Sequence, residues 1–120
     1  MIDIYIYDVK KRSMQEPTFL ILTALAAGPQ HGYAIIADAE RISGGATRLQ
    51  TGTLYMALDR LSSAGQVEPD REEVADGRLR RYYRLTDDGA TVLAAETERR
   101  RASAAIAAQR LSARLAGGIA

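Results

Sequence analysis

Residues 51–86 read TGTLYMALDRLSSAGQVEPDREEVADGRLRRYYRLT, and the first part of this stretch predicts a helix. Its large apolar residues recur at the i, i+4, i+7 spacing of one helical face, at Leu54, Leu58 and Leu61. That spacing buries one side of a helix and leaves the other side in solvent. Thr51 is suited to the N-cap, and Gly65 to the left-handed cap that follows a helix. We therefore expect a helix between these two residues.

A β-hairpin is predicted immediately after this helix. Residues 66–72 and 78–85 flank the sequence Ala75-Asp76-Gly77, and Asp-Gly favours a tight hairpin turn. Tyrosine and leucine side chains give the second segment the composition of a strand. Alternation puts one set of its side chains toward the core, namely Leu79, Arg81, Tyr83 and Leu85. The other set then faces solvent, namely Arg78, Arg80, Tyr82 and Arg84.

Two helices are predicted before this stretch. Pro17 suits the first turn of a helix whose residues 19–27 are apolar nearly all round, and Gly28-Pro29 ends it. A second helix is expected over residues 31–43, because its apolar residues follow helical spacing and Gly44-Gly45 comes next. With the helix after Thr51, these segments would form a three-helix core in front of the hairpin.

A long helix is predicted after the hairpin. Thr86, followed by Asp87 and Asp88, combines a hydroxyl N-cap with acids that stabilise a helix N-terminus. The helix is expected to extend from Asp87 to about Leu115. It has a heptad-like seam that comprises Leu93, Thr97, Arg100, Ala104, Ala107, Leu111 and Arg114. This seam is too weak for a strict coiled coil, so we expect packing on the first helix or the N-terminal arm of a partner subunit.

Length and composition fit one domain that is not embedded in a membrane. The chain has 120 residues, 47% of them apolar, and it has no cysteine for disulfides, thiolate metal ligands or thiol catalysis. The apolar run over residues 19–27 is far shorter than the ~20 residues that span a bilayer. Lys10, Lys11 and Arg12 follow the apolar N-terminal stretch, whereas a signal peptide has its basic residues first. We therefore expect a cytoplasmic protein.

Three parts of the chain follow from these patterns. Residues 1–13 alternate isoleucine with aspartate and tyrosine, which predicts a short strand or an extended N-terminal arm. Residues 14–86 would form the domain of helices and hairpin. Residues 87–120 would form the long helix and a tail.

The helix after Thr51 has the arrangement of a DNA-recognition helix. Its outward-facing side chains are Thr53, Tyr55, Met56, Asp59 and Arg60. Side chains near the N-terminus of such a helix reach base edges in the major groove, and N–H groups near Gly52 would bind a phosphate. An ordinary amphipathic surface helix has the same periodicity, so both interpretations stay open at this point.

Charge is unevenly distributed although the net charge is only +1. Residues 68–76 contain five acids and one base, whereas residues 78–84 contain four arginines and no acid. Fields decay over about 10 Å in physiological salt, so a phosphate responds to local charge rather than to the net charge. Arg99-Arg100-Arg101 is a second basic cluster, which we expect to be a solvated face rather than a DNA contact.

The arginines of the second strand are candidates for DNA contacts. Arg78 and Arg80, close to the turn, are suited to phosphate or minor-groove contacts. The alternative is cross-strand ion pairing with Glu68, Asp70, Glu72 and Glu73, and Arg84 suits that role equally well. The complete set of candidate DNA-binding residues is Thr51, Gly52, Thr53, Tyr55, Met56, Arg60, Arg78 and Arg80.

The residues offer no catalytic or metal site. His31 is the only histidine, and at the start of a helix it suits a capping or packing role. Without a second histidine or a cysteine, neither a transition-metal site nor a nucleophile–base pair can be assembled. We therefore expect a protein that is not an enzyme and has no cofactor. Tyr33 is expected to be a core aromatic residue with its hydroxyl at the surface.

Three motifs in this order resemble those of the PadR-like transcriptional regulators. They are His31-Gly32-Tyr33, then Thr51-Gly52-Thr53-Leu54-Tyr55, then Gly77-Arg78 with Arg81-Tyr82-Tyr83 and Leu85-Thr86-x-x-Gly89. The resemblance covers residues 16–93, and the order and spacing of the three motifs make it specific. The sequence departs from the pattern at Met56, where proline is usual, and at Gln66, where an apolar residue is usual. The first departure would alter what the recognition helix reads.

The resemblance implies a winged helix-turn-helix fold, mainly helical with a small β-hairpin and a long C-terminal dimerisation helix. It also implies a homodimeric repressor that binds inverted repeats in double-stranded DNA. A small aromatic or drug-like effector near the dimer interface is implied as well, although the long helix lacks a tryptophan that would stack on a flat ring. The alternative is a winged-helix module that binds another protein instead of DNA, which the acids of residues 68–76 would favour.

Overall fold

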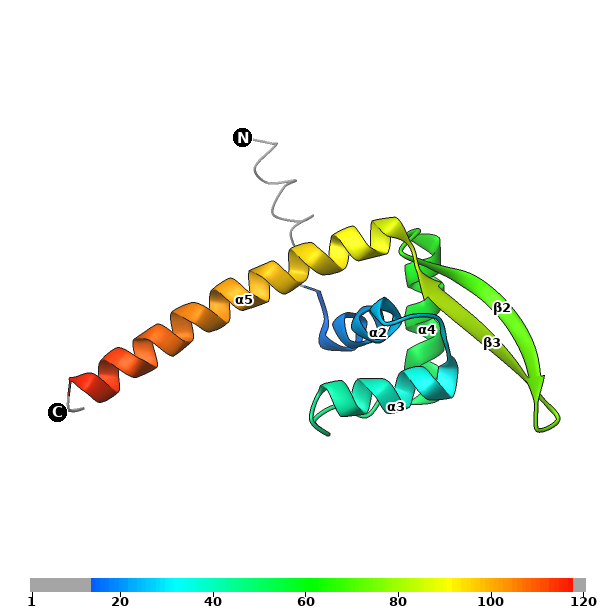
Figure 1. Cartoon of the computed structure of the whole chain (residues 1–120), viewed down its shortest axis with the longest axis horizontal. Helices are drawn as coiled ribbons and strands as arrows, with labels where there is room; N and C mark the ends of the chain where they lie inside the picture. The colour runs from blue at the N-terminus through cyan, green and yellow to red at the C-terminus, as the bar shows by residue number, and fades with distance from the viewer. Residues whose placement is uncertain (1–13, 118–120) are drawn as a thin grey trace.

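The computed structural model describes residues 14–117, which form a helical body with a hairpin on one side and a long helix that extends away from it (Figure 1). The elements are α2 (Glu16–Ala26), β1 (Gln30–His31), α3 (Gly32–Ile42), α4 (Thr51–Ser63), β2 (Val67–Ala75), β3 (Arg78–Leu85) and α5 (Asp87–Ala116). The predicted order of three helices, a hairpin and a long helix is confirmed. The predicted arm over residues 1–13 lies outside the described residues.

The core is centred on α2, which packs between α3, α4 and α5 (Figure 1). Leu20, Ile21, Leu22 and Leu25 are almost inaccessible to solvent, as the apolar run predicts. The inward faces of the other elements complete this core with Ile35, Ala39, Leu49, Leu54, Ala57, Leu58, Leu61 and Val67. Full burial of each large aliphatic side chain contributes about 1.5–3 kcal/mol, so this cluster is the main source of stability.

The helix boundaries follow local capping chemistry, with one correction. Thr86 caps α5 as predicted, because its hydroxyl accepts a hydrogen bond from the Gly89 N–H at 3.0 Å. The prediction that Thr51 caps α4 is wrong. The first hydrogen bond of that helix connects the Leu54 N–H to the Gln50 carbonyl at 2.9 Å, so Gln50 is the N-cap residue. Thr51 is therefore the first helical residue, and its side chain is exposed.

The sheet has three antiparallel strands in the order β1-β3-β2, whereas the sequence predicted only the two-stranded hairpin. The additional strand β1 pairs Gln30 with Tyr83 and His31 with Tyr82. β2 extends to Ala75, three residues beyond the predicted end at residue 72. The two-residue turn at Asp76-Gly77 has φ values of 53° and 74°, the left-handed conformation that Asp-Gly favours.

Three predictions of core-facing side chains are wrong, and the first concerns Arg81, whose side chain is 66% exposed. Leu79 was expected in the core and is 55% exposed, and Tyr33 was expected in the core and is 67% exposed. The base of the hairpin packs against the core through Tyr83 and Leu85, and its tip projects beyond the helices (Figure 1). On α3, Ile35 and Ala39 occupy the buried face, which leaves Tyr33 on the solvent side.

The long helix α5 packs against the body only in its first half. Leu93 contacts the core, and the Arg100 guanidinium lies 4.0 Å above the centre of the Phe19 ring. From residue 101 to residue 117 every side chain is exposed. At the base of the helix, a Cβ on Gly89 would collide with the backbone carbonyl of Gln66, which explains why the Leu-Thr-x-x-Gly motif ends in glycine. The predicted packing of α5 on a partner subunit stays a prediction.

Candidate nucleic-acid interface

The N-terminal end of α4 presents polar and apolar side chains to solvent on one side of the molecule. Thr51, Gly52 and Thr53 are exposed, and Met56 is 73% exposed, while Leu54 between them is buried. The Gln50 side chain makes no capping hydrogen bond to the first turn. The first N–H groups of α4 therefore lack side-chain acceptors from their own cap, and together with the helix dipole they favour an anion.

Tyr55 is held against the start of α3. A Cβ at position 32 would collide with the Tyr55 hydroxyl, so glycine at this position allows α3 and α4 to approach closely. Tyr55 is nevertheless 41% exposed, so part of its ring is accessible from solvent. The glycine of the His-Gly-Tyr motif therefore leaves the space that the Tyr55 side chain occupies.

His31 links α3 to the hairpin, and its predicted capping role is confirmed. Its Nδ1 atom accepts a hydrogen bond from the Ala34 N–H at 3.4 Å, and its ring meets the Tyr82 ring edge-on at 5.2 Å. Burial, and then the positive charge of Arg80, lower the pKa of His31 from its ordinary 6.5. The ring is therefore neutral at pH 7, the state in which a ring nitrogen can accept this hydrogen bond.

The arginines of the hairpin divide into paired and available groups. The Arg84 Nε donates to a Glu68 carboxylate oxygen at 2.7 Å, and Arg81 pairs with Glu72 at 3.1 Å. Arg80 lies 4.0 Å from Asp76, at the limit for an ion pair. Arg78 has no ion pair within residues 14–117. The predicted ion-pair alternative thus applies to Arg84, while Arg78 and Arg80 keep their charge available.

A shallow hollow of about 100 Å³ connects the recognition helix to the hairpin. Its lining comprises His31, Gly32, Tyr33, Tyr55, Arg78, Leu79, Arg80 and Arg81. A smaller hollow of about 70 Å³ beside it is lined by Gly32, Tyr33, Ile36, Thr51 and Tyr55. Drug-sized ligands occupy about 300–1,000 Å³, so neither hollow suits one. The sequence did not predict Tyr33 as part of this surface, although its place in the His-Gly-Tyr motif was a usable signal.

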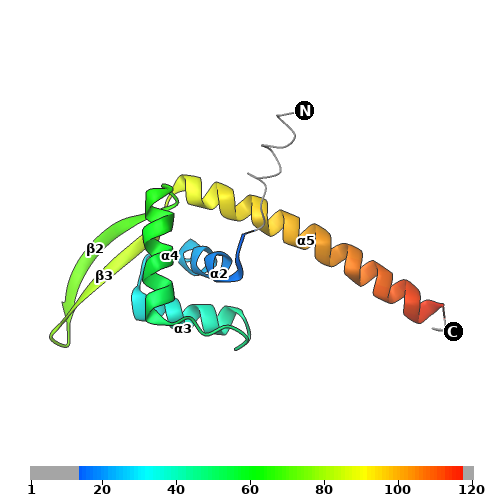
Figure 2. The same ribbon diagram turned by 180° about the vertical axis from the view of Figure 1, so that it is seen from behind.

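Arg60 is directed away from these hollows. Its guanidinium donates to the Thr18 hydroxyl at 2.8 Å, which ties the second half of α4 to α2. The other predicted residues of α4 lie at or near its N-terminal end. That end and the hairpin turn are on the same side of the body, away from the start of α5 (Figures 1 and 2). The guanidinium of Arg60 is therefore engaged by α2 instead of facing these hollows.

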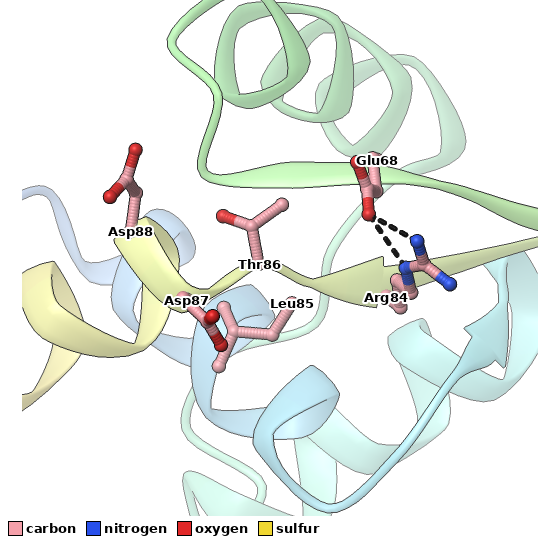
Figure 3. A pocket seen from close by; sticks show the side chains of 6 residues that line it. All are labelled: Glu68, Arg84, Leu85, Thr86, Asp87 and Asp88. Carbon is pink, nitrogen blue, oxygen red and sulfur yellow. Dashed lines mark hydrogen bonds and ion pairs between the residues drawn. The ribbon is translucent and has the colours of Figure 1, made fainter.

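A further hollow of about 470 Å³ lies where the hairpin meets α5 (Figure 3). It is lined by Glu68, Arg84, Leu85, Thr86, Asp87 and Asp88. Three of these residues are carboxylates, and the single guanidinium is already bound to Glu68 (Figure 3). The hollow would therefore repel a phosphate. Among the described residues, no group of three or more histidine, cysteine or acidic side chains is arranged to hold a metal ion.

A helical core, an exposed recognition helix and a β-hairpin beside it define the winged helix-turn-helix class of proteins. Residues 21–95 match the family model described as the transcriptional regulator PadR-like family. The chain belongs to this family. No helix within residues 14–117 has the length and apolar character needed to cross a membrane.

The chain is similar in sequence to a known protein and in fold to solved structures. The chain is 47% identical over 77 residues to an uncharacterized 37.1 kDa protein of a Streptomyces fradiae transposon, in which the match spans 64% of this chain and 21% of that protein. A PadR family transcription regulator from Clostridium difficile superposes with a TM-score of 0.66 at 26% identity, over 81% of this chain and 99% of that one. Bacillus subtilis PadR in complex with operator DNA superposes with a TM-score of 0.58 at 24% identity, over 66% and 45% of the two chains.

Proposed function

We propose that this chain is a sequence-specific DNA-binding repressor that acts as a homodimer on an inverted-repeat operator. The observation that carries the proposal is the hollow shared by the recognition helix and the wing, where Tyr33 and Tyr55 meet Arg78 and Arg80. The surface combines exposed hydroxyl groups with available guanidinium groups, the donors that phosphate oxygens accept from.

In the proposed complex, the N-terminal end of α4 enters the major groove. Thr53, Tyr55 and Met56 reach base edges, and the N–H groups at Thr51 and Gly52 bind a phosphate. The DNA backbone next to that groove crosses the hollow. The wing, β2 and β3 with their turn, then approaches the adjacent minor groove.

Dimerisation through α5 is supported by the exposure of its second half. Ile106, Leu111 and Leu115 are each more than half exposed. All 16 residues of the segment 101–116 are exposed, so the described chain does not bury its apolar side chains. A second copy of the chain would cover these side chains and place two recognition helices about 34 Å apart, one turn of DNA.

We further propose that a small-molecule effector binds beside α5 in the dimer and releases the DNA. The exposed apolar side chains of α5 support this proposal, since a dimer would gather them into one apolar surface.

The salt dependence of DNA binding tests the proposed function. Fluorescence anisotropy with DNA from upstream of its own gene should show binding that weakens about 10³–10⁵-fold between 50 and 200 mM salt, because bound phosphates release counterions. A flat dependence would contradict the proposal. Absence of binding at low salt would favour a protein-interaction module. The acids of β2 give that alternative little support, because Glu68 and Glu72 are paired with arginines of β3.

A further inference from the structure

The tip of the wing carries two exposed apolar side chains that the core does not use. Val74 is 75% exposed and Leu79 is 55% exposed, and they lie opposite each other in the β2–β3 register. Opposite residues of an antiparallel pair point to the same face, so the two side chains form one apolar tip. They are direct cross-strand neighbours, and more than half of each residue is exposed to solvent.

The surroundings of this apolar tip point to DNA as its partner. Leu79 lines the same hollow as Tyr33 and Tyr55, so the tip is continuous with the proposed DNA surface. Arg78 follows the turn directly and has no ion pair in the described part of the chain. A small apolar surface beside an available guanidinium complements the minor groove, which has phosphates along its rims and sugar carbons on its walls.

We propose that Val74 and Leu79 enter the minor groove of the operator and select A·T over G·C base pairs there. This inference rests on the proposed function and assigns the wing a role in specificity. In the minor groove, adenine and thymine present only acceptors, and guanine adds the N2 amino group as a donor. Arg78 donates to a phosphate at the rim of the groove. The apolar tip displaces water from the guanine amino group, offers it no acceptor and meets it sterically.

Base analogues isolate this contact from the major groove. The probe is a duplex of about 30 base pairs, selected from a random pool by the full-length protein, with the wing contact located by hydroxyl-radical footprinting. The base pairs under the wing are then made A·T, G·C or inosine·C. Inosine·C has the minor-groove groups of A·T and the major-groove groups of G·C. The protein should bind inosine·C as tightly as A·T, and G·C about 10-fold more weakly.

Substitutions at the tip supply the matched controls. Leu79→Ala should weaken binding to the A·T duplex about 5-fold and reduce the preference over G·C to less than about 2-fold, with an unchanged salt slope. Leu79→Met keeps an apolar tip and should retain the preference, whereas Leu79→Asn should lose it. Arg78→Ala should instead reduce the salt slope by about 0.9, the value for one lost phosphate contact. Circular dichroism melts verify that each variant is folded.

The outcomes separate this inference from the proposed function. If the unaltered protein binds no duplex at low salt, both fail. If it binds with a steep salt dependence but Leu79→Ala keeps full affinity and preference, only the role of the wing tip is overturned. Inosine·C binding that equals G·C binding would also overturn it, because the discrimination would then come from the major groove.

Discussion

Glu96 offers a quantitative test of how α5 is fixed to the body. It is only 7% exposed, and its carboxylate accepts hydrogen bonds from Arg99 at 2.6 and 3.0 Å and from Arg100 at 2.8 Å. Arg100 also donates to Glu16 at the start of α2 at 2.7 Å and covers the Phe19 ring. Glu96→Gln removes the negative charge at the centre of this network and keeps the size of the side chain.

The expected magnitude follows from the pKa of the carboxyl. Hydrogen bonds from Arg99, opposed by burial and supported by Arg100, lower the pKa of Glu96 from 4.5 to about 2. This shift corresponds to about 3 kcal/mol of stabilisation by the charged form. The Arg99 side chain is 47% exposed, so solvent screens part of the attraction. We therefore expect Glu96→Gln to reduce the free energy of unfolding by about 2 kcal/mol at pH 7.

Urea unfolding followed by circular dichroism, at fixed protein concentration and a series of pH values, measures this effect. A lowered pKa stabilises the folded state above the ordinary pKa of 4.5, and the contribution is lost as pH falls toward 2. The difference between the original and Glu96→Gln proteins should therefore shrink over that range. The control is Glu98→Gln, because the Glu98 side chain is 75% exposed. This substitution should lower the free energy of unfolding by less than about 0.5 kcal/mol. The reasoning is refuted if Glu96→Gln lowers the free energy of unfolding no more than the control does. It is also refuted if the loss for Glu96→Gln is the same at pH 2 as at pH 7.

Two further predictions concern the recognition surface. Gly32→Ala should reduce stability by about 1–3 kcal/mol because its Cβ meets the Tyr55 hydroxyl, and Tyr55→Phe in the same chain should recover part of the loss in thermal melts. A Gly32→Ala protein as stable as the original would contradict this close approach. Arg84→Ala should leave the salt slope of DNA binding unchanged, because its guanidinium is already paired with carboxylates, whereas Arg78→Ala should reduce the slope by about 0.9. Equal slopes for the two variants would argue against the division of the wing arginines.

Local signals predicted the elements of this fold well. The leucine spacing gave α4, the Asp-Gly pair gave the hairpin turn, and Thr86 with the following acids gave the start of α5. Each of these signals acts within a few residues of the chain. The strand β1 has only two residues, too few for any periodicity, and it exists because β3 offers it a free edge.

Burial and pairing were harder to predict because they depend on distant elements. Alternation along β3 predicts the face on which Leu79 lies. It does not predict that the tip of the wing extends past the helices and leaves Leu79 exposed. Helical spacing likewise included Tyr33 in the apolar set, although α2 and α4 do not cover it. The division between Arg84 and Arg78 required the strand register, which sets Glu68 opposite Arg84 and Ala75 opposite Arg78. The burial of Glu96 was not predicted, because an acid followed by arginines is typical of a solvent-exposed helix face.

In the proposed complex, α4 reads bases in the major groove while the arginines of the wing hold the DNA backbone. The most direct measurement is the ratio of Kd values for the selected operator and for a scrambled duplex, compared between Tyr55→Ala and Arg80→Ala. We predict that Arg80→Ala weakens binding to both duplexes by the same factor. Tyr55→Ala should weaken binding to the operator more than binding to the scrambled duplex, which brings the two Kd values closer together. If neither variant changes the affinity for the operator or for the scrambled duplex, these roles of α4 and the wing arginines are wrong.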